Sequence, residues 1–153
     1  MTTLHETLIF ERTVKASAAT VFAAFADPAA RAAWGAPSDT AVVIYDEADF
    51  RAGGCDRFRC GSKANPNIHG ETRYLEITED CRIVSSETIS MDGKKLCASL
   101  TTLELTPHGS ETKLKTTTQL ASFIGQDMVS GHKMGTNASL DNLVTWLGSR
   151  FCT

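Results

Sequence analysis

Residues 82–106 read RIVSSETISMDGKKLCASLTTLELT, and this stretch decides the fold. Two runs of strand-forming residues, 82–91 and 96–106, flank Asp92-Gly93, a pair that supplies the positive φ angles of a tight hairpin turn. Because the connection is so short, the two strands must pair in an antiparallel sense. The stretch therefore predicts an antiparallel sheet, and the same pattern extends along the chain in both directions.

Short turn-forming segments separate further strand patterns on either side of this hairpin. Ser17 is a good N-cap for a helix over 18–26. Pro28 ends that helix, because proline disfavours α geometry in the preceding residue, and it opens a second helix over 28–34. Apolar residues return at helical spacing over 127–148. Strands are expected at residues 7–15, 41–48, 55–62, 68–78, 82–91, 96–106 and 111–121. The predicted fold is α+β, with an antiparallel sheet of six to seven strands, two short helices after the first strand and a long C-terminal helix.

Length and composition restrict the class of protein. The chain has 153 residues, which suits a single domain over 1–153, and its hydrophobic content of 42% is that of an ordinary globular protein. A net charge of -3 argues against a nucleic-acid partner, and short apolar runs argue against a membrane span. We expect a cytoplasmic protein, because the N-terminus lacks a signal-peptide pattern and the five cysteines include no Cys-x-x-Cys pair. No metal-binding or nucleotide-binding motif is present, so no metal and no cofactor are expected.

Polar residues share the inner face of the predicted strands with apolar ones. Side chains alternate across a strand, so Ile83 at a core position brings Ser85 and Glu87 to the same face. The same argument places Thr101 and Thr116 on the inner face of the next two strands. Buried polar groups need partners or water, which favours a partly polar cavity between the sheet and the long helix. The alternative is a polar strand face that is simply exposed to solvent.

Glu87 and His132 are the two candidate reactive groups. An inward-facing Glu87 could bind a polar ligand group or act as a general base, because carboxylates are rarely buried without a partner. The alternative is an ion pair with Arg57 or Arg59, or an exposed side chain. His132 lies on the apolar side of the long helix, where it could donate a proton or anchor a ligand. A half-buried histidine bonded to a neighbour is the simpler interpretation.

Four further residues are candidate ligand contacts. Met128 lies on the same side of the long helix as His132. Arg57 and Arg59 are two residues apart and share a face, where they could bind a carboxylate with two hydrogen bonds, although exposed arginines are common on strands. Trp34 could line the mouth of the cavity or belong to the core. The predicted ligand-binding residues are Glu87, His132, Met128, Arg57, Arg59, Trp34, Ser85, Thr101 and Thr116.

Several short motifs occur along the chain in a fairly specific order and spacing. They are Phe10–Ala16, Ala19–Phe25, Asp27-Pro28, Trp34, Gly53-Gly54, Tyr74–Ile77, Leu103–Pro107 and Leu140–Leu143. Together they resemble the START-like superfamily, also called SRPBCC, and within it the proteins similar to the C-terminal domain of the activator of heat-shock-protein-90 ATPase. The resemblance covers about residues 7–148. It implies a helix-grip fold, in which a curved sheet wraps around the C-terminal helix and encloses a hydrophobic tunnel.

The resemblance leaves several functions open. Members of the superfamily bind lipids, hormones or polyketides, some catalyse cyclisation or dehydration, and some stimulate a chaperone, and the fold alone does not choose among these. Thr136 stands where the family often has tryptophan. We expect this change to enlarge one end of the predicted cavity or to admit water there. We expect a protein that binds a small hydrophobic or amphipathic molecule. The alternatives are a cyclase or hydrolase using Glu87 or His132, and a chaperone co-factor. A chaperone and a second copy of the chain are the protein partners considered.

Overall fold

The structure is a computed structural model that describes residues 2–151. Over these residues, seven antiparallel strands form one sheet that packs with three helices. In chain order the elements are β1 (Leu4–Val14), α1 (Ala18–Ala26), α2 (Pro28–Gly35), β2 (Ala41–Glu47), β3 (Cys55–Ser62), β4 (Asn65–Thr78), β5 (Arg82–Met91), β6 (Lys94–His108), β7 (Glu111–Ser122) and α3 (Gln126–Phe151). The predicted α+β class and element order are confirmed.

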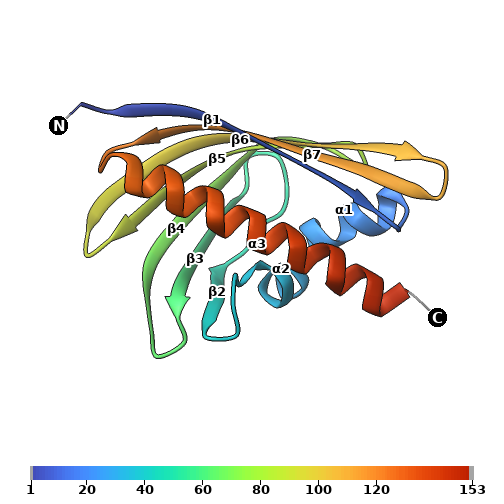
Figure 1. Ribbon diagram of the computed structural model, residues 1–153, viewed down its shortest axis with the longest axis horizontal. Helices are drawn as coiled ribbons and strands as arrows, with labels where there is room; N and C mark the ends of the chain where they lie inside the picture. The colour runs from blue at the N-terminus through green and yellow to red at the C-terminus, as the bar shows by residue number, and fades with distance from the viewer. Residues whose placement is uncertain (1, 152–153) are drawn as a thin grey trace.

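The sheet is a series of hairpins closed by the first strand. Its order is β1-β7-β6-β5-β4-β3-β2, so β1 lies beside the last strand in the sequence. Figure 1 shows the sheet curving around α3, which lies along its concave side, with α1 and α2 near the C-terminal half of that helix. This is the helix-grip arrangement expected from the sequence.

The two short helices begin where their capping residues predict. The Ser17 side chain accepts a hydrogen bond of 3.1 Å from the backbone amide of Thr20 at the start of α1. Asp27 ends α1 and caps α2, and its Oδ1 accepts from the Ala29 amide at 3.0 Å. Pro28 fills the first position of α2, where a missing amide proton leaves no hydrogen bond unmade. The caps explain why sequence alone locates both helices closely.

Turn chemistry fixes the hairpins in the same way. Asp92 and Gly93 have φ angles of 52° and 76°, the positive values that the β5–β6 turn requires. Strand β4 begins at Asn65, earlier than the predicted residue 68, because the ladder with β3 continues as far as the Ser62–Asn65 pair. The sequence pattern therefore locates each strand, while the hydrogen bonds to the neighbouring strand determine where the strand begins and ends.

One half of the concave face is a packed core, which we call the packed half. It lies mainly on β1, β6 and β7. Its buried strand residues are Leu8, Phe10, Leu103, Leu105, Leu114 and Leu120, and its helix residues are Leu140, Leu143 and Leu147. A fully buried side chain of this size contributes about 1.5–3 kcal/mol. Most of the stability of the fold therefore comes from this half.

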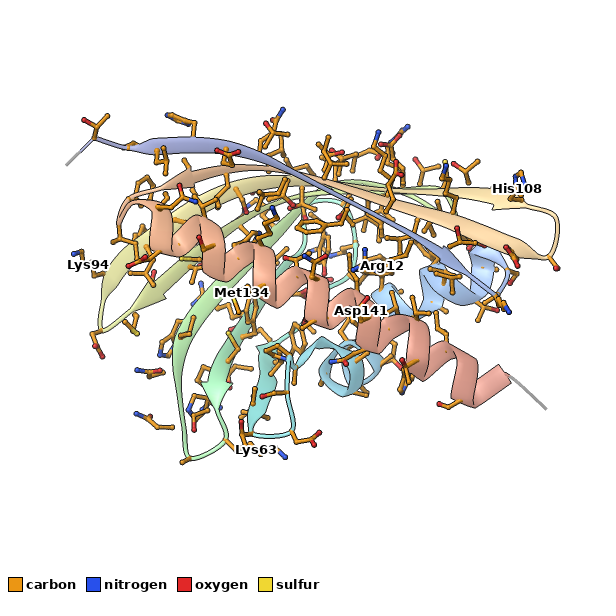
Figure 2. All side chains as sticks on the ribbon, in the orientation of Figure 1. Arg12, Lys63, Lys94, His108, Met134 and Asp141 are labelled. Carbon is orange, nitrogen blue, oxygen red and sulfur yellow. The ribbon has the colours of Figure 1, made fainter. Side chains whose placement is uncertain are left out.

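Polar contacts hold the middle of α3 in place over the packed half. Ser139 and Asn142 each donate a hydrogen bond of 2.6 Å to the backbone that follows α2 or ends it. Arg12 of β1 reaches across to Asp141, with 3.0 Å between Arg12 Nε and Asp141 Oδ1, and the two labelled side chains meet in Figure 2. These contacts anchor the helix from Ser139 onward.

The other half of the concave face, on β2 to β5, is only partly covered, and we call it the open half. The principal neighbours of α3 are α2, β1 and β7, so the helix lies farther from these strands. Asp56, Tyr74, Ile83 and Ile89 of this half are buried. Its other inward side chains are only partly buried: Val43, Tyr45, Phe58, Cys60, Ile68, Thr72, Ser85, Glu87 and Met91. The concave face thus changes from a closed core to an accessible surface across a single sheet.

Candidate functional site

A row of polar side chains crosses the open half perpendicular to the strands. Asp56, Thr72, Glu87 and Ser99 are direct register partners on β3, β4, β5 and β6. Paired residues in an antiparallel sheet point to the same face, so all four point inward. We call these four residues the polar row. Their alignment brings together polar groups that are distant in the sequence.

Glu87 is the ionisable residue of the polar row that lacks a cationic partner. Its Oε2 accepts a hydrogen bond of 3.0 Å from Thr72 Oγ1, and no described cation forms an ion pair with it. The side chain is only partly buried. Burial raises the pKa of Glu87, the hydrogen bond from Thr72 opposes that change, and the nearby Asp56 adds to it.

Asp56, by contrast, is fully engaged in a buried cluster. Its Oδ2 accepts from Arg31 Nη1 at 2.5 Å and from the Tyr74 hydroxyl, and its Oδ1 accepts from the Asp49 amide at 3.1 Å. Arg31 also donates to the Tyr74 oxygen at 2.6 Å. Asp56 has no exposed surface. The cluster ties α2 to β3 and β4, and it neutralises the Arg31 charge within the protein.

Tyr45 connects this cluster to the apolar part of the open half. Its ring lies 4.5 Å from the Arg31 guanidinium carbon and 5.7 Å from the Phe58 ring. Burial raises the pKa of Tyr45 to about 12, although the Arg31 charge opposes the shift. The Tyr45 hydroxyl therefore stays protonated at neutral pH, and no described residue forms a hydrogen bond with it.

The Phe58 ring lies flat against the sheet because the residue beside it is glycine. A Cβ atom at Gly70 would come within 2.0 Å of the ring, so only glycine allows this position. The next inward residues beyond Phe58 on β3 and β4 are Cys60 and Ile68, which are also half-buried. The result is a low apolar floor next to the polar row.

The predicted residues Ser85, Thr101 and Thr116 all face inward, as the alternation indicates. Ser85 is half-buried in the open half. Thr101 is already paired, because its hydroxyl lies 3.0 Å from that of Thr118. Thr116 is buried in the packed half, where its hydroxyl has no hydrogen-bond partner. Ser85 and Thr101 are register partners in the pair next to Glu87–Ser99, whereas Thr116 lies in the packed half.

Arg57 and Arg59 lie on the opposite face of the sheet from Glu87. They share a face, as predicted, but their neighbours Asp56 and Phe58 point inward, so both arginines point outward. Arg57 pairs with Glu47 at 3.7 Å, and Arg59 forms two 2.9 Å hydrogen bonds with Asp46. The structure thus contradicts both an ion pair with Glu87 and a place for these arginines in the concave site.

Trp34 belongs to the core rather than to the mouth of a cavity. Its ring is buried in α2 and packs edge-on against Phe25 at 5.0 Å. Its indole nitrogen donates to the backbone oxygen of Ala24 at 3.1 Å. An indole with its one donor already bonded, and its ring covered, is a packing residue that joins the two short helices.

His132 and Met128 lie half-buried on α3, on the side of the buried Val129. Burial alone lowers the pKa of His132, which indicates that no carboxylate stands close enough to stabilise the protonated ring. His132 is therefore neutral at pH 7. His132 and Glu87 are not brought together as an acid–base pair, and this arrangement gives no support to a two-residue catalytic mechanism.

The structure also has two surface depressions, neither of which contains a predicted site residue. One, of about 370 Å³, is lined by residues 5–7 of β1 and 119–121 of β7. The other, of about 360 Å³, lies between α1, α2 and the C-terminal part of α3, around Trp146. In residues 2–151, no group of three His, Cys, Asp or Glu side chains could hold a metal ion, and no helix is long and apolar enough to span a membrane.

Five residues that surround Glu87 or support its neighbours are not predicted by the sequence patterns: Arg31, Tyr45, Asp56, Thr72 and Tyr74. A signal for Asp56 exists, since an inward Phe58 places Asp56 on the inner face by the same alternation that located Glu87. Arg31 and Tyr74 have no comparable signal. Their meeting depends on the position of α2 over the sheet, which no local pattern specifies.

The curved antiparallel sheet, the long helix along its concave side and the half-covered inner face define a helix-grip protein of the START-like class. The family model described as Activator of Hsp90 ATPase homolog 1-like protein matches residues 15–148. The chain belongs to that family. No protein of curated function matches the chain.

Solved structures of bacterial proteins share the whole fold. The Mll3558 protein from Rhizobium loti is 36% identical, with a TM-score of 0.84 over 95% of this chain and 99% of that protein. A protein from Rhizobium leguminosarum is 28% identical, with a TM-score of 0.86 and 97% coverage of both chains. Protein CV1439 from Chromobacterium violaceum is 26% identical, with a TM-score of 0.80 over 92% of this chain and 96% of that one.

Proposed function

We propose that the protein binds a small hydrophobic or amphipathic molecule against the open half of its concave face. One observation carries the proposal: four apolar side chains that point toward the inside of the fold are only partly buried, namely Val43, Phe58, Ile68 and Met91. Inward apolar surface is normally removed from water, and a contiguous accessible patch of it is typical of a binding site. The fold family, in which hydrophobic ligands are typically bound, supports the same function.

The contrast with the packed half supports a purpose for this surface. The same sheet closes its core completely where Leu103, Leu114 and Leu120 meet α3. Replacing Cys60 or Ser85 with a larger apolar residue would be a small change in sequence, and it would extend the closed core into the open half. A ligand that covers the open half would remove its apolar surface from water and stabilise the folded state.

Binding of Nile red, a neutral hydrophobic dye, tests the proposal. We expect the dye to become fluorescent with wild-type protein, and Ile68→Trp to weaken its affinity at least tenfold by filling the open half. Leu100→Trp is the matched control, because Leu100 lies on the convex face of β6. Absence of binding to wild type, or equal binding to both variants, would contradict the proposal. Thermal unfolding of each variant establishes that it is folded.

A further inference from the structure

The proposed binding surface has an accessible carboxylate but no available cation, and this difference bears on the kind of ligand it accepts. This inference rests on the proposed function. Glu87 Oε2 is held by Thr72, while Oε1 has no donor in the described protein. Asp56, its neighbour in the polar row, has its oxygens occupied by Arg31, Tyr74 and a backbone amide. The accessible carboxylate in the row is therefore Glu87.

The cations nearest the concave face are all unavailable to a ligand. Arg31 is neutralised by Asp56, and its Nε and Nη2 atoms are buried without partners and out of reach of solvent. Arg12 is paired with Asp141 at the edge of the sheet. Arg57 and Arg59 are on the other face. An anionic ligand would therefore meet the Glu87 carboxylate without a compensating positive charge.

The remaining titratable groups around Glu87 are neutral at physiological pH. Burial raises the pKa of Cys60 and of Cys97 to about 11, with a further contribution from Glu87 in each case. Tyr45 keeps its proton, and His132 on α3 is unprotonated. Tyr45, Asp56, Cys60, Tyr74 and Cys97 are the described ionisable side chains that point inward beside Glu87 from β2, β3, β4 and β6, whereas His132 on α3 makes no described contact with Glu87. None of them offers a charge that could bind a carboxylate or phosphate.

We propose that Glu87 anchors a hydrogen-bond donor on an amphipathic ligand, a hydroxyl or a protonated amine, and that the open half rejects anionic amphiphiles. The ligand head would donate to Glu87 Oε1 within the polar row. Its apolar part would lie on the adjacent floor formed by Phe58, Ile68 and Met91. Phe58 is two residues from Asp56 on β3, while Ile68 and Met91 are four residues from Thr72 and Glu87 on β4 and β5. A protonated amine would gain most, because its charge favours the ionised form of Glu87 against the effect of burial on the pKa, and hydrogen bonds between ionised partners are the strongest.

Three amphiphiles of equal chain length test this selectivity: decylamine, 1-decanol and decanoate, each used below its micelle concentration to displace Nile red at pH 7. We expect decylamine and decanol to displace the dye at concentrations at least tenfold lower than decanoate. In Glu87→Gln, which can still accept from Thr72, the preference for decylamine over decanoate should fall at least tenfold. Glu104→Gln, on the exposed convex side of β6, is the matched control and should leave the ranking unchanged.

The outcomes separate the two proposals. If Nile red binds and Ile68→Trp abolishes binding, the binding function stands. Decanoate binding as tightly as decylamine, or an unchanged ranking in Glu87→Gln, would then overturn the donor selectivity alone. If neither the dye nor any amphiphile binds the folded wild type, the binding function itself fails. Should Glu87→Gln not fold, the wild-type ranking of the three amphiphiles still decides the inference.

Discussion

The packed half and the open half belong to one sheet, yet they use the inner face in opposite ways. In the packed half, inward leucines on β6 and β7 are covered by Leu140, Leu143 and Leu147 of α3. In the open half, the inward apolar residues Val43, Phe58, Ile68 and Met91 are only partly buried, and the polar row lies beside them. The difference shows that one layer of a small fold can supply stability while the adjoining surface is left for binding.

The largest expected effect is a difference in stability between the two halves. Leu114→Ala removes a fully buried side chain of the packed half and should lower the free energy of unfolding by about 3–5 kcal/mol. Met91→Ala, in the half-exposed surface, should lower it by about 1 kcal/mol because less contact area is lost. Urea unfolding of both variants measures this. Similar losses would show that the open half is as tightly packed as the rest.

The Arg31–Asp56–Tyr74 cluster should behave as part of the packed structure despite lying beside the polar row. Asp56→Ala leaves the buried Arg31 without its counter-charge and should cost about 3 kcal/mol. Replacing both residues, as in Arg31→Met with Asp56→Ala, should recover part of that loss. A double-mutant cycle monitored by thermal unfolding gives the coupling. A negligible effect of Asp56→Ala would contradict the arrangement described.

Glu87 should instead destabilise the empty protein at neutral pH. Its pKa is raised in the folded state, mainly by burial, above the ordinary value of 4.5. Between the two values the folded chain holds more protons than the unfolded chain, so stability falls as the pH rises through that window. Glu87→Gln cannot ionise and should be more stable than wild type at pH 7, with the difference vanishing below about pH 4. Unfolding midpoints across this pH range test the sign.

The smallest expected effect is in the N-terminal half of α3. Gly131 and Gly135 would meet nothing within 4 Å if a Cβ were added, so no close approach to the sheet explains them. Gly131→Ala and Gly135→Ala should each stabilise the helix by about 0.5–1 kcal/mol, because glycine has the greater freedom in the unfolded chain. Calorimetric melting temperatures measure this. A loss of stability in either variant would indicate packing that this structure does not contain.

Most of the fold could be predicted from the sequence because its determinants are local. Ser17 and Pro28 mark helix ends by their own chemistry, and Asp92-Gly93 does the same for the central hairpin. Alternation also gave the inward direction of Glu87. These features depend on a few neighbouring residues, and no knowledge of the distant chain is required to interpret them.

The surroundings of Glu87 could not be predicted in the same way. Thr72 became its partner through the register of β4 with β5, which is set by the whole ladder. The prediction that Arg57 and Arg59 bind ligand rests on their shared face alone, whereas the apolar Phe58 between them indicates that both arginines point outward. Trp34 was ambiguous until α2 was seen packed on α1. Each of these depends on contacts between separate elements.

A crystal structure of the protein with decylamine would test the central claim most directly. We expect the ligand amine within hydrogen-bond distance of Glu87 and the alkyl chain on Phe58, Ile68 and Met91. Ligand density in the groove around Trp146, or at the β1–β7 edge, with an unoccupied open half would contradict it.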